Sequence, residues 1–340
     1  MQNMAGQVSL GVERRTPAFA HPFTLSCLAF CASAALLIGS WPLQLSIVTV
    51  LLFAGPHNWM ELRYFLSRMP ARWGKSRLFY SVGLAGVAVL TCAYVALYLL
   101  GQSWYLDQQV WAVSISGWNT LLLMWLSALV YVRGRQVKGR DWSWVFAFGF
   151  ALCALAWLCP LWFSLGLVYL HPLVALWFLD RQLKRTRPQW RRGYHFCLMV
   201  LPLLLCVMWA GQAGAQSLPD DGALSWRITQ HAGAGLLSNV PSRLLVSTHV
   251  FLETIHYGVW LVLIPLAGLG AKAWRAERMP LVARGGGLAR YVKAALGLSV
   301  LAVLALWAGF AVDYATTRDV YFTFAIAHVL AEAPFLIRLL

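Results

Sequence analysis

The feature that most constrains the fold of this chain is a series of long apolar stretches, which recurs along nearly all of its 340 residues. About 20 apolar residues are enough for an α-helix to cross the hydrocarbon core of a bilayer. The predicted spans are 24–41, 43–66, 79–101, 109–132, 142–158, 161–180, 195–213, 246–271, 292–311 and 318–338. With 60% hydrophobic and 11% charged residues, the composition excludes an ordinary soluble domain. We predict an all-α fold, a polytopic integral-membrane bundle of about ten transmembrane helices.

The spans divide the chain simply. Residues 1–22 are predicted to form a cytoplasmic N-terminal tail, and 23–340 a single transmembrane bundle with a longer outer loop at about 214–245. That loop is amphipathic around Trp226 and Ile228, which predicts a segment on the membrane surface or a lid over the bundle. His231, in the same loop, is assigned to this surface or lid rather than to a ligand set.

The formal net charge of +15 is explained by membrane topology, without a nucleic-acid partner. Basic residues follow every second predicted span, so only Arg227, Arg243 and Arg318 fall on the opposite side. Because cytoplasmic loops carry the excess of Lys and Arg, both termini are expected in the cytoplasm, in a bacterial inner membrane whose lipids contact the basic loops. A cleaved signal that begins at Arg14 and Arg15 is the alternative interpretation of the first span.

Three of the five glutamates stand inside predicted spans, and each follows a histidine by four residues. The pairs are His57 with Glu61, His249 with Glu253, and His328 with Glu332. This spacing puts both side chains on one face of a helix, and ionisable groups at such depth seldom face lipid. His256 extends the second pair by a further turn. We therefore expect four histidines and three glutamates to converge inside the bundle.

This set of side chains is typical of sites for non-haem iron or another borderline transition metal. We predict one or two iron ions, with zinc or manganese as alternatives and haem as a further one. The predicted metal ligands are His57, Glu61, His249, Glu253, His256, His328 and Glu332. One ion could take the four histidines while the glutamates orient them, or two ions could share the carboxylates. Glu61, Glu253 and Glu332 are also the candidate catalytic residues, as bridging ligands or proton acceptors.

Two features of the histidines leave alternatives open. His171, which precedes Pro172, is either a further ligand or a histidine bonded to a carbonyl that the proline frees. Measured from the cytoplasmic ends of their predicted spans, His57 lies about 13 Å deep and His256 about 22 Å deep, at 1.5 Å per residue. Helix tilt or different helix ends must account for that difference.

The segment Gly55-Pro56-His57 resembles the G-x-P-H-G-x-x-D type segment of the Brp/Blh family of bacterial and archaeal membrane β-carotene cleavage enzymes. The resemblance covers about one helix. Asn58 stands where the family has glycine, and the acid is Glu61 rather than aspartate. The resemblance implies a helical bundle in which His57 is one of several intramembrane histidines that hold iron, and it implies a carotenoid substrate.

A metal site enclosed by membrane helices suits a substrate that arrives through the bilayer. We expect a metal-dependent oxidoreductase or oxygenase that acts on an isoprenoid, carotenoid or acyl chain, with an electron donor as a candidate partner. The first alternative is a proton or metal-ion transporter or channel that uses the same residues. A second is a non-catalytic subunit that holds haem or a pigment. Hydrogen-bonded pairs that only fix the helices are the purely structural alternative.

Overall fold

The computed structural model describes residues 21–104, 107–136, 141–219, 222–268, 277, 279–283, 285 and 287–339. Every regular element in these ranges is a helix, which confirms the predicted all-α fold. Of the predicted tail 1–22, all but the last two residues lie outside the described ranges.

Each predicted span coincides with a helix or a continuous helical run. The helices are α1 Pro22–Ser40, α2 Pro42–Arg68, α3 Arg77–Trp104, α4 Gln108–Gln136, α5 Trp144–Leu158, α6 Pro160–Thr186, α7 Arg191–Gly211, α8 Ala223–His231, α9 Ser242–Gly258, α10 Ile264–Gly268, α11 Pro280–Ala283, α12 Gly287–Val312 and α13 Tyr314–Arg338. A π-helical segment, Val259–Leu263, joins α9 to α10, so these three elements form the run predicted as one span.

In the described part of the chain, eight helical runs are long and apolar enough to cross a bilayer, so the chain is a multi-pass membrane protein. The two remaining predicted spans differ for separate reasons. Helix α5 is strongly apolar but has 15 residues, which is short for a full crossing. Helix α2 has 27 residues, but Pro56, His57 and Glu61 lower the hydropathy of its second half. The helix that departs most from an apolar span therefore carries two of the predicted ligands.

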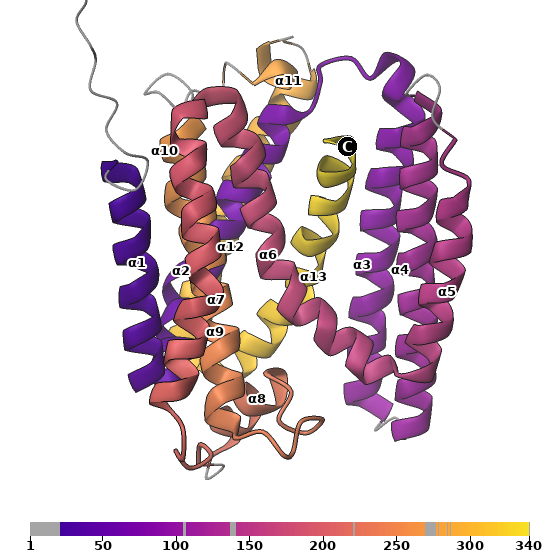
Figure 1. Cartoon of the computed structure of the whole chain (residues 1–340). Helices are drawn as coiled ribbons and strands as arrows, with labels where there is room; N and C mark the ends of the chain where they lie inside the picture. Colours follow the sequence, from indigo (N-terminus) through magenta and orange to yellow (C-terminus); the bar gives the residue numbers. More distant parts are fainter. Residues whose placement is uncertain are drawn as a thin grey trace, which may run out of the picture.

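The bundle has two groups of helices with two helices between them (Figure 1). Helices α3, α4 and α5 pack in sequence on one side, while α1, α2, α7, α9 and α12 form the other. Helix α13 contacts α3 as well as α2 and α12, and α6 contacts α4 and α5 as well as α9. The middle of the molecule is therefore bounded by α6 and α13 together with α2 and α9.

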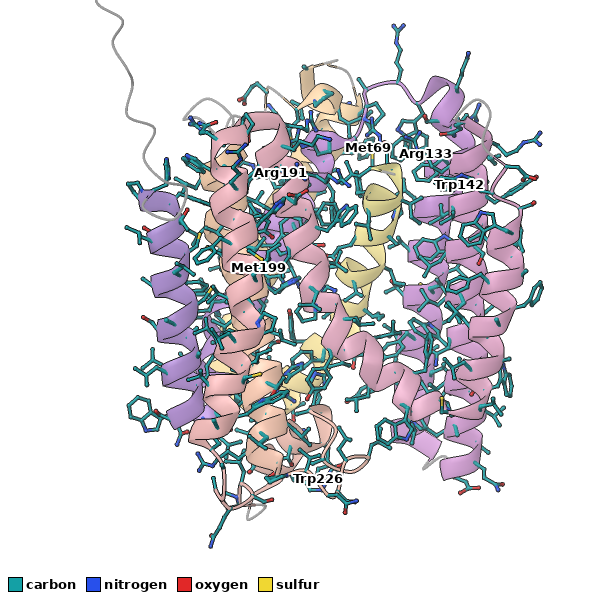
Figure 2. All side chains as sticks on the ribbon, in the orientation of Figure 1. Met69, Arg133, Trp142, Arg191, Met199 and Trp226 are labelled. Atoms are coloured by element: carbon teal, nitrogen blue, oxygen red, sulfur yellow. The ribbon has the colours of Figure 1, made fainter. Side chains whose placement is uncertain are left out.

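The two ends of the bundle differ in character. Arg133 and Arg191 lie near the end at which the last helix finishes, and Trp226 lies near the opposite end (Figure 2). Trp226 belongs to α8, the short helix in the predicted outer loop, which packs against α9 and α2 and buries Ile228 and Thr229. This part of the loop therefore folds as a lid on one end of the bundle.

The contact between α3 and α4 depends on a glycine. Trp125 of α4 donates a hydrogen bond from Nε1 to the carbonyl oxygen of Val82, at 2.9 Å, and its ring lies against Gly86 of α3. A Cβ atom at position 86 would lie 1.8 Å from Trp125 Nε1. Because Trp125 is buried and hydrogen-bonded, the ring cannot move aside without loss. Small residues commonly allow such close approach between membrane helices.

We expect Gly86→Ala to destabilise the folded protein by about 1–3 kcal/mol, because the added methyl group displaces the Trp125 ring. The measurement is the free energy of unfolding in mixed micelles of mild detergent and dodecyl sulfate. Gly117→Ala is the matched control: position 117 has no atom within 4 Å of an added Cβ, so it should gain about 0.5–1 kcal/mol from helix propensity. Equal stability of the two variants would contradict this account of the packing.

Candidate metal centre

Four helices each place one histidine near the middle of the bundle: His57 on α2, His171 on α6, His256 on α9 and His328 on α13. His57 and His256 are buried, and the other two are partly buried. Glu61, one turn beyond His57 on α2, has no exposed surface. Because the four helices surround the centre of the bundle, one histidine from each of them reaches the same region.

The four imidazole rings form a closed arrangement. The centroid separations between successive rings are 5.3 Å for His57 and His256, 4.7 Å for His256 and His171, 5.1 Å for His171 and His328, and 5.2 Å for His328 and His57. His256 and His328 face each other across this arrangement at 6.5 Å. The rings therefore surround one common point.

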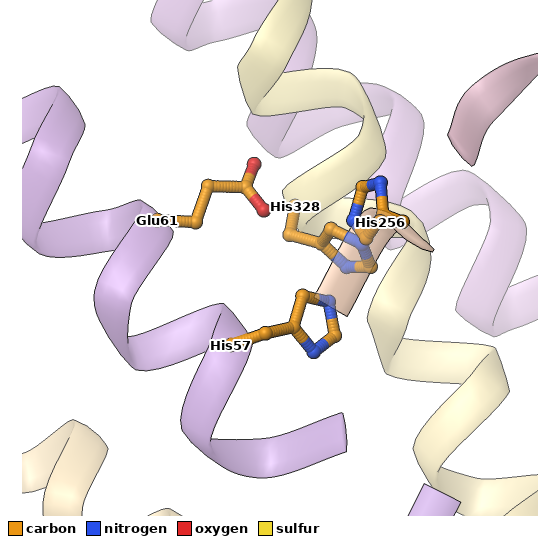
Figure 3. A group of neighbouring side chains, drawn as sticks. All are labelled: His57, Glu61, His256 and His328. Atoms are coloured by element: carbon orange, nitrogen blue, oxygen red, sulfur yellow. The ribbon is translucent and has the colours of Figure 1, made fainter. Parts of the chain in front are cut away.

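The donor atoms converge as well as the rings. One donor atom from each of His57, Glu61, His256 and His328 lies within 4.8 Å of the other three (Figure 3). His171 lies outside this group of four, but its Nε2 atom is 3.3 Å from Nε2 of His328. Two imidazole nitrogens bound to one ion at about 2.0–2.1 Å are separated by about 2.9–3.4 Å for ligand angles between 90° and 109°. The 3.3 Å separation therefore fits two neighbouring ligands of one metal ion.

Three of the rings are oriented through their other nitrogen. Nδ1 of His57 lies 3.0 Å from the Phe53 carbonyl oxygen, and Nδ1 of His256 lies 3.4 Å from that of Pro172. Nδ1 of His171 lies 3.1 Å from Oε2 of Glu332. The two carbonyl oxygens accept hydrogen bonds from Nδ1 of His57 and His256, so the Nε2 lone pairs of these two rings stay free to bind a metal, while Glu332 makes only an ion-pair contact with His171.

Several buried polar atoms at the centre have no hydrogen-bond partner among the described residues. They include both carboxylate oxygens of Glu61, Nε2 of His256 and Nδ1 of His328. Polar atoms buried without a partner are rare in folded proteins and call for an explanation. A metal ion at the centre would satisfy Glu61 and Nε2 of His256, so the residues present fit a metal.

The histidines lie at similar depths, so the difference expected from the sequence does not arise. His57 is 11 residues before the end of α2, which corresponds to roughly 17 Å. His328 is 10 residues before the end of α13, or roughly 15 Å. Helix α2 extends to Arg68, two residues beyond the predicted span, and the donor atom of His256 lies within 4.8 Å of those of His57 and His328.

The predicted ligands His249 and Glu253 do not join the group of four. They lie on α9, His249 two turns and Glu253 one turn before His256, toward the end covered by α8. Nδ1 of His249 is 4.0 Å from Oε2 of Glu253, and Tyr257 donates a hydrogen bond to Oε1 of Glu253 at 2.7 Å. The ring of Tyr257 lies 4.6 Å from that of His57. Glu253 is therefore linked to the centre through Tyr257.

The three histidine–glutamate pairs predicted from the sequence thus play different roles in the structure. Of the three pairs, only His249 and Glu253 come within 4.0 Å of each other as an ion pair in one helix. Glu332 reaches across to His171 on α6 instead of His328 on its own helix. Glu61 turns toward the centre, in the direction of His256 and His328 (Figure 3). The repeated spacing located the site, but it did not predict which residues contact each other.

Irregular helix geometry accompanies the histidines. Pro56 immediately precedes His57, Pro172 immediately follows His171, and both lie inside their helices. A proline in a helix interior removes a backbone hydrogen bond and bends the helix, and α6 changes direction part-way along its length (Figure 1). The π-helical segment Val259–Leu263 begins three residues after His256. Segments of this type occur frequently at functional sites.

The histidine centre lies in the wall of a cavity of about 1070 Å³. All four central histidines and Glu332 line it. The rest of the wall is mainly aromatic and aliphatic, and includes Tyr94, Trp111, Trp118, Leu122, Trp125, Leu167, Val168 and Ile326. At one end the wall is formed by α8 and the start of α13. A cavity of this size is at the upper end of, or above, the range of sites for drug-sized molecules.

Sequence reasoning singled out His171 only as one of two alternatives, and the structure brings it to the centre. Position 175, four residues further on, is alanine, so the pattern that identified the other pairs did not apply. A histidine in the middle of an apolar helix was the available signal. His231 of α8 lies in the cavity wall, with its ring 5.0 Å from His249, and is not part of the metal group.

No protein family, no curated protein and no solved structure matches this chain. The resemblance of Gly55-Pro56-His57 to the Brp/Blh segment therefore stays a prediction from the sequence.

Proposed function

We propose that this protein is an integral-membrane, metal-dependent oxidoreductase or oxygenase that holds non-haem iron and acts on a lipophilic substrate. The observation that carries the proposal is the closed set of four imidazoles in the wall of a large, mainly apolar cavity, with Glu61 beside three of them. An ion held there would be within reach of an apolar molecule in the cavity. Bound iron supplies the activation of dioxygen that such chemistry needs.

The donor set favours iron over the other candidates. Three imidazoles and one carboxylate form the group of four, His171 stands beside it as a candidate fifth ligand, and a combination of imidazole and carboxylate suits non-haem iron. Haem fits less well, because the porphyrin nitrogens occupy four positions on the iron and leave two for protein ligands. Four rings whose successive centroids are 4.7–5.3 Å apart instead suit a bare ion.

Different residues of the chain would bind the ion, orient its ligands and accept a proton. His57, Glu61, His256 and His328 would hold the ion with His171 beside them, and the Glu332 carboxylate, 3.1 Å from Nδ1 of His171, would orient that ring. Tyr257 donates a hydrogen bond to Glu253 at 2.7 Å beside His57, and the Glu253 carboxylate would accept a proton released by the substrate. The mainly apolar wall would favour an apolar molecule over water in the remainder of the cavity.

We further propose a bacterial inner membrane as the location, with both termini cytoplasmic. The C-terminal end of α13 and the labelled Arg133 and Arg191 lie at one end of the bundle, and α8 lies at the other (Figure 2). This arrangement agrees with the bias of Lys and Arg toward one side. An electron donor would approach from the cytoplasmic end, and membrane lipids would surround the apolar exterior.

A proton or metal-ion path is the second candidate function, and one observation favours it. His231, His249, Glu253 and Tyr257 form a sequence of close contacts that leads from α8 toward His57. Such rows of ionisable groups are typical of proton relays in transporters. In a metal-dependent oxygenase the same row can deliver protons to the centre.

The proposal predicts incorporation of labelled oxygen into a lipid. Protein reconstituted with ferrous iron in detergent is incubated with a bacterial lipid extract and a reductant under ¹⁸O₂, and products are analysed by mass spectrometry. We expect ¹⁸O in at least one lipid product, and none with a His57→Ala variant. Iron-loaded, folded wild-type protein that yields no labelled product, but that carries protons or metal ions across the membrane of proteoliposomes, would favour the second candidate.

A further inference from the structure

An unpaired, buried arginine lies at the end of the cavity that α8 covers. Arg318, in the second turn of α13, is 3% exposed and lines the same cavity as the four central histidines. Its guanidinium carbon lies 4.6 Å from the centre of the Phe322 ring. The arginine is thus packed against an aromatic face in the wall of the cavity.

Glu253 and Asp319 are near enough to interact electrostatically with this arginine, but neither forms an ion pair with it. Asp319, the next residue along the chain, forms its ion pair with Arg227 of α8. Among the described residues, no carboxylate oxygen lies within 4.0 Å of the Arg318 guanidinium, and its buried Nε has no hydrogen-bond partner. A buried guanidinium cannot lose its proton and requires an anion or several acceptors. The structure therefore leaves a place for an anionic group beside Arg318.

Two imidazoles lie at the same end of the cavity. The rings of His231 and His249 are 5.0 Å apart, and the His231 ring is 4.5 Å from the Phe322 ring that Arg318 also contacts. Both histidines line the cavity. Together with Arg318 they offer hydrogen-bond donors around one small polar region in a wall that is otherwise mainly apolar.

We propose that this region binds the carboxylate head group of an amphiphilic substrate, whose hydrocarbon chain lies along the aromatic wall and reaches the metal centre. The inference rests on the proposed function and names its substrate class. The planar fork of an arginine matches a carboxylate with two parallel hydrogen bonds, which makes a carboxylate the best complement to Arg318. Trp118 and Trp125 of α4 provide the apolar surface for the chain.

The spacing along α13 sets where such a substrate would meet the metal. Arg318 and His328 lie on the same helix, ten residues apart, which corresponds to roughly 15 Å. An extended chain advances by about 1.2 Å for each covalent bond, judged from the dimensions of extended polypeptide. The position held at the metal would then be on the order of ten bonds from the carboxylate. This register predicts a mid-chain site of reaction in a long-chain acid.

The test is equilibrium binding of radiolabelled oleate and of methyl oleate to the purified full-length protein in a neutral detergent. The two probes share one hydrocarbon chain and differ in the charge of the head group. We expect wild-type protein to bind oleate at least about tenfold more tightly than the ester, as for a charge-assisted pair in a buried site. Arg318→Gln should lower oleate affinity by a similar factor and remove the preference.

Arg243→Gln is the matched control, because Arg243 is near the start of α9 but does not line the cavity. Its oleate affinity should equal that of wild type. Equal binding of oleate and its ester by wild-type protein would overturn the inference, and so would an Arg318→Gln variant that keeps the preference. The comparison of oleate with methyl oleate on wild-type protein tests the head-group site even when the Arg318→Gln variant does not fold.

Metal content, measured on the same samples, separates this inference from the proposed function. Arg318→Gln should retain the metal, since Arg318 lies roughly 15 Å from His328 along α13. Wild-type protein that prefers oleate but binds no metal would contradict the proposed function and leave the head-group site standing. Wild-type protein that binds metal but does not prefer oleate over its ester would contradict the head-group site and leave the proposed metal centre standing.

Discussion

The His256→Ala variant is expected to bind metal at least about 100-fold more weakly than wild type, because loss of an outer-shell partner alone costs about 10–100-fold. His256 is buried, its Nδ1 is directed to the Pro172 carbonyl, and its Nε2 has no partner among the described residues. Its ring is therefore oriented to donate one lone pair to the centre. Metal titration of the stripped protein, followed by its absorption spectrum, gives the affinity.

His231→Ala is the control for this loss. His231 lines the same cavity and also contacts another histidine, at 5.0 Å between ring centroids, but it stands outside the metal group. The His231→Ala variant should keep the wild-type affinity for metal. Both His231→Ala and His256→Ala should retain the helicity of wild type. Tight metal binding by a folded His256→Ala variant would show that the ion is held elsewhere. Loss of metal in His231→Ala would extend the centre to α8.

Replacement of Glu61 by methionine is expected to change the stability of the protein in opposite directions with and without metal. Both carboxylate oxygens of Glu61 are buried and unpartnered among the described residues, so metal-free wild type carries an unsatisfied group at that position. Metal-free Glu61→Met should be more stable by about 1–3 kcal/mol, the usual cost of a buried unsatisfied polar group. With saturating metal the order reverses, because a ligand that binds only the folded state stabilises it.

Glu253→Met is the matched control for this comparison. Glu253 accepts a hydrogen bond from the buried Tyr257 hydroxyl, so its removal should destabilise the metal-free protein by about 1–3 kcal/mol. Unfolding in mixed micelles, with and without metal, provides all four free energies. A Glu61→Met variant that is less stable than wild type without metal would mean that the Glu61 carboxylate has a structural role.

The helices could be predicted almost completely from the sequence, because length and hydropathy are local properties. Each predicted span coincides with a helix or a helical run. The boundaries were less accurate where polar residues continue a helix: α2 reaches Arg68 and α6 reaches Thr186, whereas the predictions stopped at 66 and 180. The π-helical segment Val259–Leu263 also left no clear signal in the sequence.

The candidate site could be predicted only in part, because contacts between helices depend on rotation and tilt. The histidine–glutamate spacing correctly indicated that His57, Glu61, His256 and His328 gather at one place. It did not predict that Glu332 pairs with His171 across two helices. The burial of Arg318 could not be predicted from the sequence either, since an arginine near a helix end ordinarily reaches the membrane surface.

The most direct test of the central claim is elemental analysis of the protein purified in mild detergent, as wild type and as the His57→Ala, His171→Ala and His328→Ala variants. The account predicts one iron per wild-type chain and its loss from each folded variant, including His171→Ala. Folded wild-type protein that contains no metal after purification and takes up none from ferrous iron would contradict it, and so would variants that keep full occupancy.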